Sequence, residues 1–384
     1  MANLHNIFII YMEKQPIKIK ILYTIPNFDT AGSGKALLNV AKSLNSEKFE
    51  PYICCDHPRG LFFKNVKDSG IPIYLKKTRV VMIPRYKGIK ETFYLAKYLK
   101  SLNVDIIHSF HYGDDYSEAL AAKIAGIPWI YTKKNMNWGG KSKNSWILRT
   151  FFSKHILAQN TEMIKEFFPK SKKVTLVPRG VNTKEFFPSA PNKGILTKYR
   201  IQKLDKVITC VANLHPVKGV EILIDAFLQI SKVFNSVHLF IIGFNDNEYG
   251  EFLKNKVNKS CKRTNIHFTG KVNNIKEFLS VSDLFVLPTL NIKRREGCPV
   301  ALLEALACGL KVLGSNVCGI NNILSDFPGN MFEAGNVVQL KEKIEEQLIK
   351  EDKIGDKLLL KHTIKNYDIM VEAKKHENVY LNIL

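Results

Sequence analysis

Two glutamates, Glu296 and Glu304, lie eight residues apart on either side of a Gly-Cys-Pro turn in REGCPVALLEALACGLKVLGSNVCG (residues 295–319). An ionised carboxylate accepts hydrogen bonds from hydroxyl groups, so both residues suit the recognition of a sugar. Glu296 is predicted to hold sugar hydroxyls, and Glu304, inside the following helix, to grip a ribose as the acidic residue of a dinucleotide site does. The alternative for Glu304 is a solvated helix face, which its apolar neighbours oppose: Leu302, Leu303, Leu306 and Ala307.

The turn between the glutamates predicts a site for an anion. An apolar run over 284–289 is typical of a buried strand, and Pro299 suits the first turn of a helix that Gly309 ends. Backbone N–H groups around the turn therefore point out of the carboxyl end of a strand, where open α/β sheets bind ligands. We expect a diphosphate to lie against the segment Gly297, Cys298, Pro299 and Val300.

Short apolar runs alternate with longer helical patterns throughout the chain, which is typical of an α/β protein with parallel sheets. Helical patterns include 34–45, 89–102 and 117–126. Candidate strands of the first half lie at 18–25, 50–55, 71–75, 105–110, 128–132, 155–160 and 173–178. Those of the second half lie at 205–213, 237–243, 265–270, 284–289 and 310–316. The alternation restarts halfway, so the sequence predicts two doubly wound, Rossmann-like domains.

The boundary between the domains is predicted within 181–198, where Pro, Gly, Ser and Asn interrupt the pattern. We therefore expect a first domain over 1–190 and a second over 191–364. An amphipathic helical pattern over 362–384 has no strand after it to complete another unit. The helix at about 365–384 is expected to pack back on the first domain.

The net charge of +22 is concentrated in the first half of the 384 residues. Residues 1–190 hold 30 Lys and Arg against 14 Asp and Glu, whereas residues 191–384 hold 27 against 21. This excess predicts an anionic partner, either a lipid surface or phosphorylated small molecules, unless lysine is merely enriched by codon usage. No nucleic-acid-binding motif accompanies the charge, so nucleic acid is not expected as a partner.

Two basic segments, 74–100 and 133–155, interleave Lys and Arg with aromatic residues that include Trp138, Trp146, Phe151 and Phe152. This composition favours reversible attachment to an anionic membrane surface. The alternative is that the aromatic residues belong to the core and the lysines are solvated.

The seven cysteines form no C-x-x-C pair and no metal-ligand spacing with histidine, which indicates reduced thiols. The longest apolar run near the N-terminus, 7–12, is too short for a signal peptide or a membrane span. The sequence therefore predicts a cytoplasmic protein, with peripheral attachment to the inner face of the cytoplasmic membrane.

The segment EGCPVALLEALACGLKVLGSNVCGI resembles the E-x7-E signature of the GT-B glycosyltransferases of family four. VANLHPVKGVEILIDAF resembles the family's phosphate-binding strand and helix, and VTLVPRGVNTKEFFP its interdomain linker. The resemblance implies two Rossmann-like domains facing across a cleft. It also implies transfer of a sugar from a UDP- or GDP-linked donor with retention of anomeric configuration, without a metal ion or other cofactor. The implied acceptor is a glycan, or a glycan on a lipid carrier, in bacterial lipopolysaccharide, capsule or exopolysaccharide synthesis.

The resemblance implies further residues around the donor diphosphate. Lys218 is expected to neutralise charge that develops on the leaving group. Many relatives carry an Arg at the position of Asn213, and here His215, or Arg294 and Arg295, could compensate. Gly32 lies in a glycine-rich turn where the backbone approaches the donor phosphate.

Other positions are implied near the sugar and the base. His111, with His108 as the second choice, is expected to lie near the reacting sugar, although His111 could be only a polar loop residue. Gly243 is expected to line the nucleotide pocket, and main-chain groups at Val272 to contact the base edge. Two alternatives remain open: a sugar-nucleotide 2-epimerase of the same fold, and a noncatalytic carbohydrate-binding relative.

Overall fold

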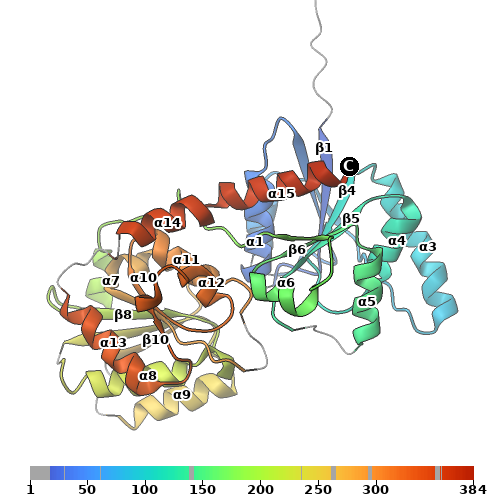
Figure 1. Cartoon of the computed structure of the whole chain (residues 1–384). Coiled ribbons are helices and arrows are strands. Elements are labelled where there is room, and N and C mark those ends of the chain that lie inside the picture. The colour runs from blue at the N-terminus through green and yellow to red at the C-terminus, as the bar shows by residue number, and fades with distance from the viewer. Residues whose placement is uncertain are drawn as a thin grey trace, which may run out of the picture.

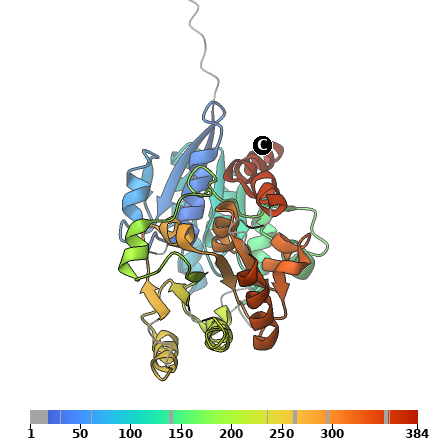
Figure 2. The same cartoon turned by 90° about the vertical axis from the view of Figure 1, so that its left-hand side faces the viewer.

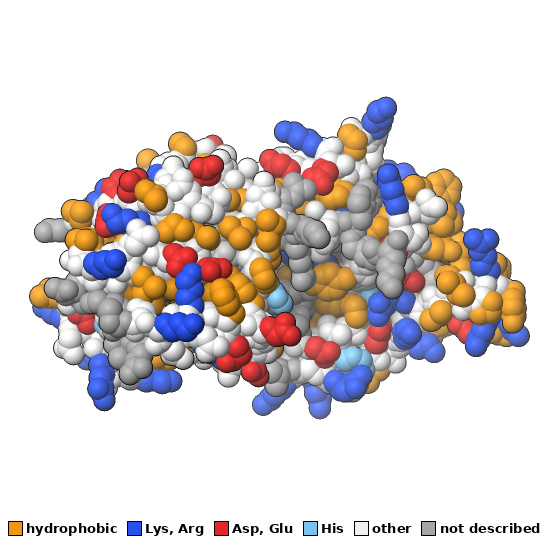
Figure 3. All heavy atoms as spheres, turned by 90° about the horizontal axis from the view of Figure 1, so that it is seen from below, with side chains coloured by type: hydrophobic (Ala, Val, Ile, Leu, Met, Phe, Trp, Pro, Cys, Tyr) orange, Lys and Arg blue, Asp and Glu red, His pale blue; other side chains and the backbone are white. Residues whose placement is uncertain are grey.

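The structure, a computed structural model, describes residues 18–384 apart from 30, 61, 138–141, 235, 261–264, 293–295, 351–354 and 356. Two all-parallel sheets, each flanked by helices, form two domains that lie side by side (Figure 1). Both sheets have the strand order of a doubly wound fold, so the predicted pair of Rossmann-like domains is confirmed. A hollow lies between the two domains when they are seen from below (Figure 3).

The first domain contains a seven-stranded sheet of order β3-β2-β1-β4-β5-β6-β7. Its strands are β1 Ile19–Ile25, β2 Phe49–Cys55, β3 Ile73–Leu75, β4 Ile106–Ser109, β5 Trp129–Lys133, β6 His155–Ala158 and β7 Val174–Leu176. Its helices are α1 Ala31–Ser43, α2 Phe63–Lys67, α3 Arg85–Ser101, α4 Ser117–Ala125, α5 Lys143–Phe152 and α6 Thr161–Phe167.

The second domain contains a six-stranded sheet of order β10-β9-β8-β11-β12-β13. Its strands are β8 Lys206–Val211, β9 Val237–Ile242, β10 Ile266–Gly270, β11 Leu284–Leu287, β12 Lys311–Ser315 and β13 Met331–Phe332. Its helices are α7 Lys193–Lys198, α8 Val220–Ile230, α9 Glu248–Asn258, α10 Ile275–Val281, α11 Val300–Ala307, α12 Ile320–Leu324 and α13 Val337–Ile349, with short 3-10 turns η1 Pro216–Lys218 and η3 Pro328–Asn330.

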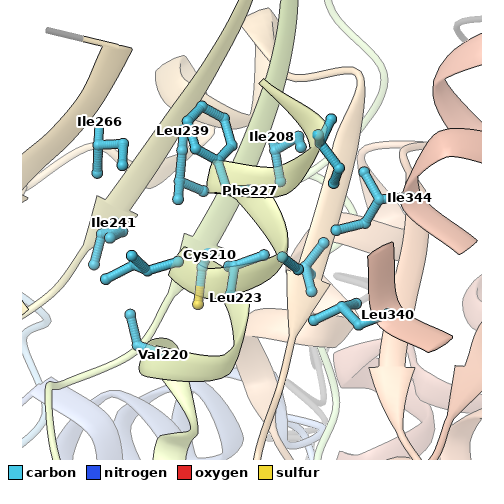
Figure 4. Close-up of a cluster of buried hydrophobic side chains, with 14 of the residues drawn as sticks. Ile208, Cys210, Val220, Leu223, Phe227, Leu239, Ile241, Ile266, Leu340 and Ile344 are labelled. Carbon is cyan, nitrogen blue, oxygen red and sulfur yellow. The ribbon is translucent and has the colours of Figure 1, made fainter. Parts of the chain in front are cut away.

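The central strands are buried on both faces, which explains why they read as continuous apolar runs. In the second domain, one face of the sheet packs against α8 and α13 (Figure 4). Phe227 and Leu223 of α8 meet Ile208 and Leu239 of the sheet in this cluster. The core therefore fixes the carboxyl ends of the strands, where ligands bind in such sheets.

The chain crosses between the domains at two neighbouring places. Val181, in the linker, accepts from the N–H of Ile369 at 2.9 Å, and its own N–H donates to Tyr367 at 2.7 Å. These bonds join the linker to the break between α14 Lys357–Tyr367 and α15 Ile369–Ile383. The two helices, in red, run along the top of both domains in Figure 1 and lie on one side of the molecule in Figure 2.

Helix α15 packs on the first domain, against α1. Tyr380 is fully buried, and its hydroxyl lies 2.9 Å from that of Tyr23 in β1 and 2.7 Å from His108 Nδ1 in β4. The helix thereby fills the core next to the central strands of the first sheet, although its residues are the last in the chain.

Two local predictions differ from the structure. Pro299 is the N-cap residue of α11, which begins at Val300, because its ψ of 104° is extended rather than helical. Strand β13, of only two residues, was absent from the prediction because it is too short for an apolar period. Gly309, with φ of +75°, ends α11 as expected.

Candidate active site

The strand order of the second sheet reverses between β8 and β11, and the loops after these two strands meet. The N–H of Leu290 donates to Val217 O at 2.8 Å, which joins the loop after β11 to η1. Gly219 follows η1 with φ of +61°, and an added Cβ would lie 3.2 Å from Leu290 Cγ and still closer to Pro288 O. Only glycine fits there, so the chain after β8 is held against the chain after β11.

This junction brings together Lys218 and Glu296, two residues that the sequence predicted separately. Lys218 Nζ pairs with Glu296 Oε1, and their side chains are 24% and 15% exposed. Thr289 Oγ1 donates to the same carboxylate oxygen at 3.4 Å. The ammonium and the carboxylate therefore lie at the carboxyl ends of the central strands, mostly shielded from solvent.

The start of α11 lies beside this pair and directly against the first domain. The Asn160 amide donates to Gly297 O at 2.6 Å, and an added Cβ at Gly297 would lie 2.7 Å from Gln159 Oε1 and closer still to Lys134 O. The N–H groups of Cys298 and Val300 come before the first bond of α11, which Leu302 donates to Pro299 O at 3.2 Å, so these two donors favour an anion at the turn. Burial raises the pKa of the Cys298 thiol to about 12, so this thiol is neutral.

Glu304, in the second turn of α11, is only 5% exposed, which rules out the solvated helix face. Its Oε1 accepts from Lys35 Nζ of α1, in the first domain, at 3.1 Å. Burial raises the pKa of Glu304, while the charge and hydrogen bond of Lys35 lower it. The predicted ribose-binding carboxylate is thus buried and paired across the two domains.

The remaining predicted residues of the second domain lie around the ends of β8, β9 and β10. Gly243 has φ of +142° and packs against Ala212 O, and the Asn213 side chain accepts from the N–H of Phe244 at 3.1 Å. His215 is exposed at the start of η1, and Val272 packs at the edge of a hydrophobic cluster. Arg294 and Arg295 lie outside the described residues.

In the first domain, Gly32 lies in the first turn of α1 and is exposed. A Cβ added there would meet no described atom within 4 Å, so the protein itself leaves space at this position. Ser33 Oγ, one residue on, bonds the hydroxyl of Tyr112 from the loop after β4. The glycine-rich turn and this loop are thereby held together.

His111 contacts residues inside the first domain rather than the Lys218–Glu296 pair. Its side chain is buried, with Nε2 at 3.0 Å from Thr78 Oγ1 and 3.4 Å from Glu118 Oε1. Burial raises the pKa of Glu118, but His111 lowers it further, to about 2. His108 is also buried, between Tyr380 and Thr132. The sugar-orienting role of His111 stays a prediction.

Lys134, directly after β5, is a buried basic residue of the first domain that sequence reasoning missed. Its Nζ donates to Phe110 O and lies 3.4 Å from the centre of the Tyr112 ring. Burial and the nearby Arg179 and Arg149 hold its pKa well below the ordinary value. The sequence does contain a sign of this residue, because two lysines follow the strand predicted over 128–132. Their basic and aromatic surroundings, however, favour a membrane-facing segment over a buried position.

Asn160 and Lys35 were also absent from the predicted site. Each belongs to the first domain: Asn160 bonds Gly297, just before α11, and Lys35 bonds Glu304, within it. Their sequence separations from these partners are 137 and 269 residues, so no local pattern joins them.

Comparison with known proteins places this geometry in a family. Residues 194–366 match the family described as "Glycosyl transferases group 1", and residues 30–185 match "Glycosyltransferase Family 4". The second match contains Lys35 and Lys134, and the first contains Lys218, Glu296 and Glu304. The chain belongs to the group 1 glycosyltransferases.

Curated relatives of this glycosyltransferase span nearly its whole length. It is 25% identical, over 90% of its own chain and 94% of the relative, to the N,N'-diacetylbacillosaminyl-diphospho-undecaprenol alpha-1,3-N-acetylgalactosaminyltransferase of Campylobacter jejuni. It is 27% identical, over 85% and 87% of the two chains, to the UDP-Gal:alpha-D-GlcNAc-diphosphoundecaprenol alpha-1,3-galactosyltransferase of Escherichia coli.

Solved structures confirm the GT-B fold. A glycosyltransferase from Rickettsia africae superposes with a TM-score of 0.81 at 19% identity, covering 95% of this chain and 98% of the other. HepE from Anabaena, in complex with UDP and glucose, superposes with a TM-score of 0.77 at 17% identity, covering 95% and 100%. The predicted family, fold and enzyme class are therefore confirmed.

Two structural observations bear on cofactors and membranes. Within the described ranges, no cluster of His, Cys, Asp or Glu side chains is suited to hold a metal ion. No helix in these ranges combines the length and the apolar character needed to cross a bilayer. Metal-free catalysis remains a prediction.

Proposed function

We propose that this glycosyltransferase moves a sugar, with retention of anomeric configuration, from a nucleoside-diphosphate sugar to a lipid-linked glycan during synthesis of a bacterial surface polysaccharide. The observation that carries this proposal is the Lys218–Glu296 pair beside the start of α11. An ammonium, a sugar-binding carboxylate and helix N–H groups together match a sugar diphosphate. The names of the relatives from C. jejuni and E. coli, which specify diphospho-undecaprenol acceptors, support the acceptor class.

Each residue has one part in the proposed reaction. Lys218, with the N–H groups of Gly32, Cys298 and Val300, neutralises the diphosphate as it leaves. Glu304 accepts hydrogen bonds from the ribose and Glu296 from the donor sugar. The acceptor hydroxyl attacks from the face that the diphosphate leaves, and a phosphate oxygen takes its proton. The rate then comes from positioning and electrostatics, without a covalent intermediate on the enzyme.

The donor nucleotide is tested by a thermal-shift screen with UDP, GDP and ADP. A nucleotide that binds only the folded protein raises its melting temperature. UDP is the first candidate, because HepE, which shares the fold, was solved in complex with UDP and glucose. If none of the three nucleotides shifts the melting temperature, the assignment of a nucleotide site to this protein is wrong.

The reaction is tested by incubating the enzyme with UDP-sugars, with and without a polyprenyl-diphosphate-linked sugar. We expect a product that needs the acceptor and keeps the anomeric configuration of the donor. An epimerised UDP-sugar formed without acceptor would identify a 2-epimerase instead, and inversion of the anomeric centre would contradict the retaining mechanism.

We also propose that the first domain attaches to an anionic membrane through a surface on α3 and α5, which we call the α3–α5 surface. Tyr86 and Phe151 are 79% and 70% exposed, although large apolar side chains are normally buried. Other exposed apolar residues on or next to these two helices are Ile83, Ile89, Phe93, Tyr94 and Ile147, and basic residues of α3 are Arg85, Lys87, Lys90, Lys97 and Lys100. Hydrophobic and basic side chains lie side by side at the α3 end of the molecule (Figure 3).

A basic surface with exposed aromatics suits an anionic leaflet, because each Lys or Arg contributes about 1 kcal/mol near it and aromatic rings insert at the interface. Trp146 is buried beside Arg149 and so belongs to the core, and Trp138 lies outside the described residues. The enzyme would then work on the cytoplasmic face, where nucleotide sugars are available.

Vesicle co-sedimentation tests this attachment. The double variant Phe93→Ser, Phe151→Ser is expected to bind phosphatidylglycerol vesicles several-fold more weakly than the wild type. Phe252→Ser, which alters a 48% exposed phenylalanine on α9 of the second domain, is the matched control. Equal binding of the double variant and the wild type, or equal binding to pure phosphatidylcholine, would contradict the proposal.

A further inference from the structure

Lys35 and Glu304 form the ion pair that joins the two domains at the candidate nucleotide site. Lys35 lies in the second turn of α1, and the two residues are 269 positions apart in the chain. The roles proposed above leave Lys35 without a function. Its position next to the carboxylate assigned to ribose suggests that it acts on the donor site.

The surroundings of Glu304 make the ammonium of Lys35 important for the charge of the carboxylate. A buried carboxylate is costly unless a cation compensates it. The groups that face it from other elements are Lys35 of α1, at 3.1 Å, and Glu185 of the linker, which itself lies 3.7 Å from Lys35 Nζ. Lys35 also lies over the Phe186 ring, at 4.9 Å from its centre, which fixes the direction of the ammonium.

The charge of Glu304 matters because only the ionised form accepts two hydroxyl hydrogen bonds with both oxygens. Burial and Glu185 raise the pKa of Glu304, and Lys35 is the group that lowers it. A neutral Glu304 would have to donate one of its bonds and would hold a ribose less well.

We propose that Lys35 is a positioning residue of the first domain that keeps Glu304 ionised and oriented for the ribose of the donor, so that nucleotide binding in the second domain depends on contact with α1. This inference rests on the proposed function, because it takes Glu304 as the ribose-binding carboxylate. It adds a condition: the nucleotide site is complete only when the two domains are together.

The experiment is UDP binding by calorimetry at pH 5.5 to 9 for the full-length wild type and three variants. The variants are Lys35→Met, which removes the cation, Lys35→Arg, which keeps it, and Lys42→Met, a matched control at an exposed site of the same helix. The ratio of variant to wild-type Kd at each pH cancels the titration of the nucleotide's own phosphate. Circular dichroism verifies that each variant is folded.

In Lys35→Met, we expect the weakening of UDP binding at low pH to begin at a higher pH than in the wild type. A shift of one pKa unit makes Kd about tenfold weaker at the acid end. The ratio should fall towards one as the pH rises, because a growing fraction of Glu304 is then ionised in both proteins. Lys35→Arg and Lys42→Met should follow the wild type. A ratio that is the same at every pH, whether UDP binds more weakly, equally or more tightly, would overturn the proposal.

A Glu304→Gln variant separates this proposal from the proposed function. Weaker UDP binding in Glu304→Gln together with a pH-independent ratio in Lys35→Met would refute the role of Lys35 alone. Unchanged UDP binding in Glu304→Gln would refute the ribose site itself, and the role of Lys35 with it.

Discussion

Lys218 and Glu296 are 78 residues apart in the chain and form an ion pair where the loops after β8 and β11 meet. The carboxylate holds the ammonium at the position proposed for the donor diphosphate. A cation that is already oriented there needs no reorganisation during the reaction, which is the condition for effective electrostatic catalysis.

Lys218→Met should therefore lower kcat by about 10²- to 10³-fold, the range seen when one group that stabilises developing charge is removed. Steady-state transfer assays measure this effect. The control is Lys254→Met, which removes a lysine that pairs with Glu251 on α9, away from the site. If Lys218→Met kept the wild-type kcat, another cation would have to serve the diphosphate.

Gly297→Ala should push the domains apart, because the new Cβ would lie 2.7 Å from Gln159 Oε1 and closer to Lys134 O, both in the first domain. We expect transfer to fall by about 10- to 100-fold, as for small misplacements of reacting groups, and the radius of gyration to rise in small-angle scattering. Gly329→Ala is the control, since its Cβ would meet no described atom within 4 Å. Unchanged scattering and activity would show that the contact is dispensable.

Glu372 of α15 should make stability depend on pH. Its burial raises the pKa to about 7 from an ordinary 4.5, although Arg179 at 3.5 Å opposes this. The native state then keeps a proton that the unfolded state releases, so this contribution to stability is lost as pH rises from about 4.5 to 7. Other ionisable groups that interact with it are His376, at 3.7 Å, Lys375, Cys298, Tyr23 and Tyr380.

Melting temperatures of the wild type and of Glu372→Gln between pH 5 and 8 check this prediction. The wild type should lose stability relative to the variant as pH rises, because glutamine cannot release a proton. If the melting temperatures of the two proteins changed equally with pH, Glu372 would have an ordinary pKa.

Tyr380→Phe should destabilise the first domain, because the hydroxyl bonds both Tyr23 and His108 in a site without solvent. Leaving such partners unsatisfied costs about 1–3 kcal/mol of unfolding free energy, measured by urea denaturation. Tyr86→Phe, at a 79% exposed tyrosine, should change nothing. Equal stability of the two variants would mean that water replaces the lost bonds.

The sheets could be predicted from sequence because their central strands are buried on both faces and appear as short apolar runs. VHLFII of β9, for example, is buried at every position. Two-residue β13 gives no such signal, since it is defined only by its pairing with β12. The fold was therefore predictable except where pairing alone defines an element.

The site was predictable one residue at a time, but the contacts within it were not. Lys218 and Glu296 were each expected near the donor, but their contact depends on β8 and β11 being neighbours in the sheet. The pairing of Lys35 with Glu304 depends on the relative position of two domains, about which neither local sequence carries information. The contacts of His111 with Thr78 and Glu118 were not predictable either, because the direction of a side chain after a strand is set by the following loop, and its place near the sugar stays a prediction.

The position of α15 has a consequence for how the chain is made. Val379 and Tyr380 belong to the same hydrophobic cluster as Ile21 and Tyr23 of the first strand. A ribosome must therefore synthesise almost all 384 residues before this cluster can be filled, whereas every strand of the second sheet has been made once residue 332 is added. The half of the enzyme that is translated first is the half that is completed last.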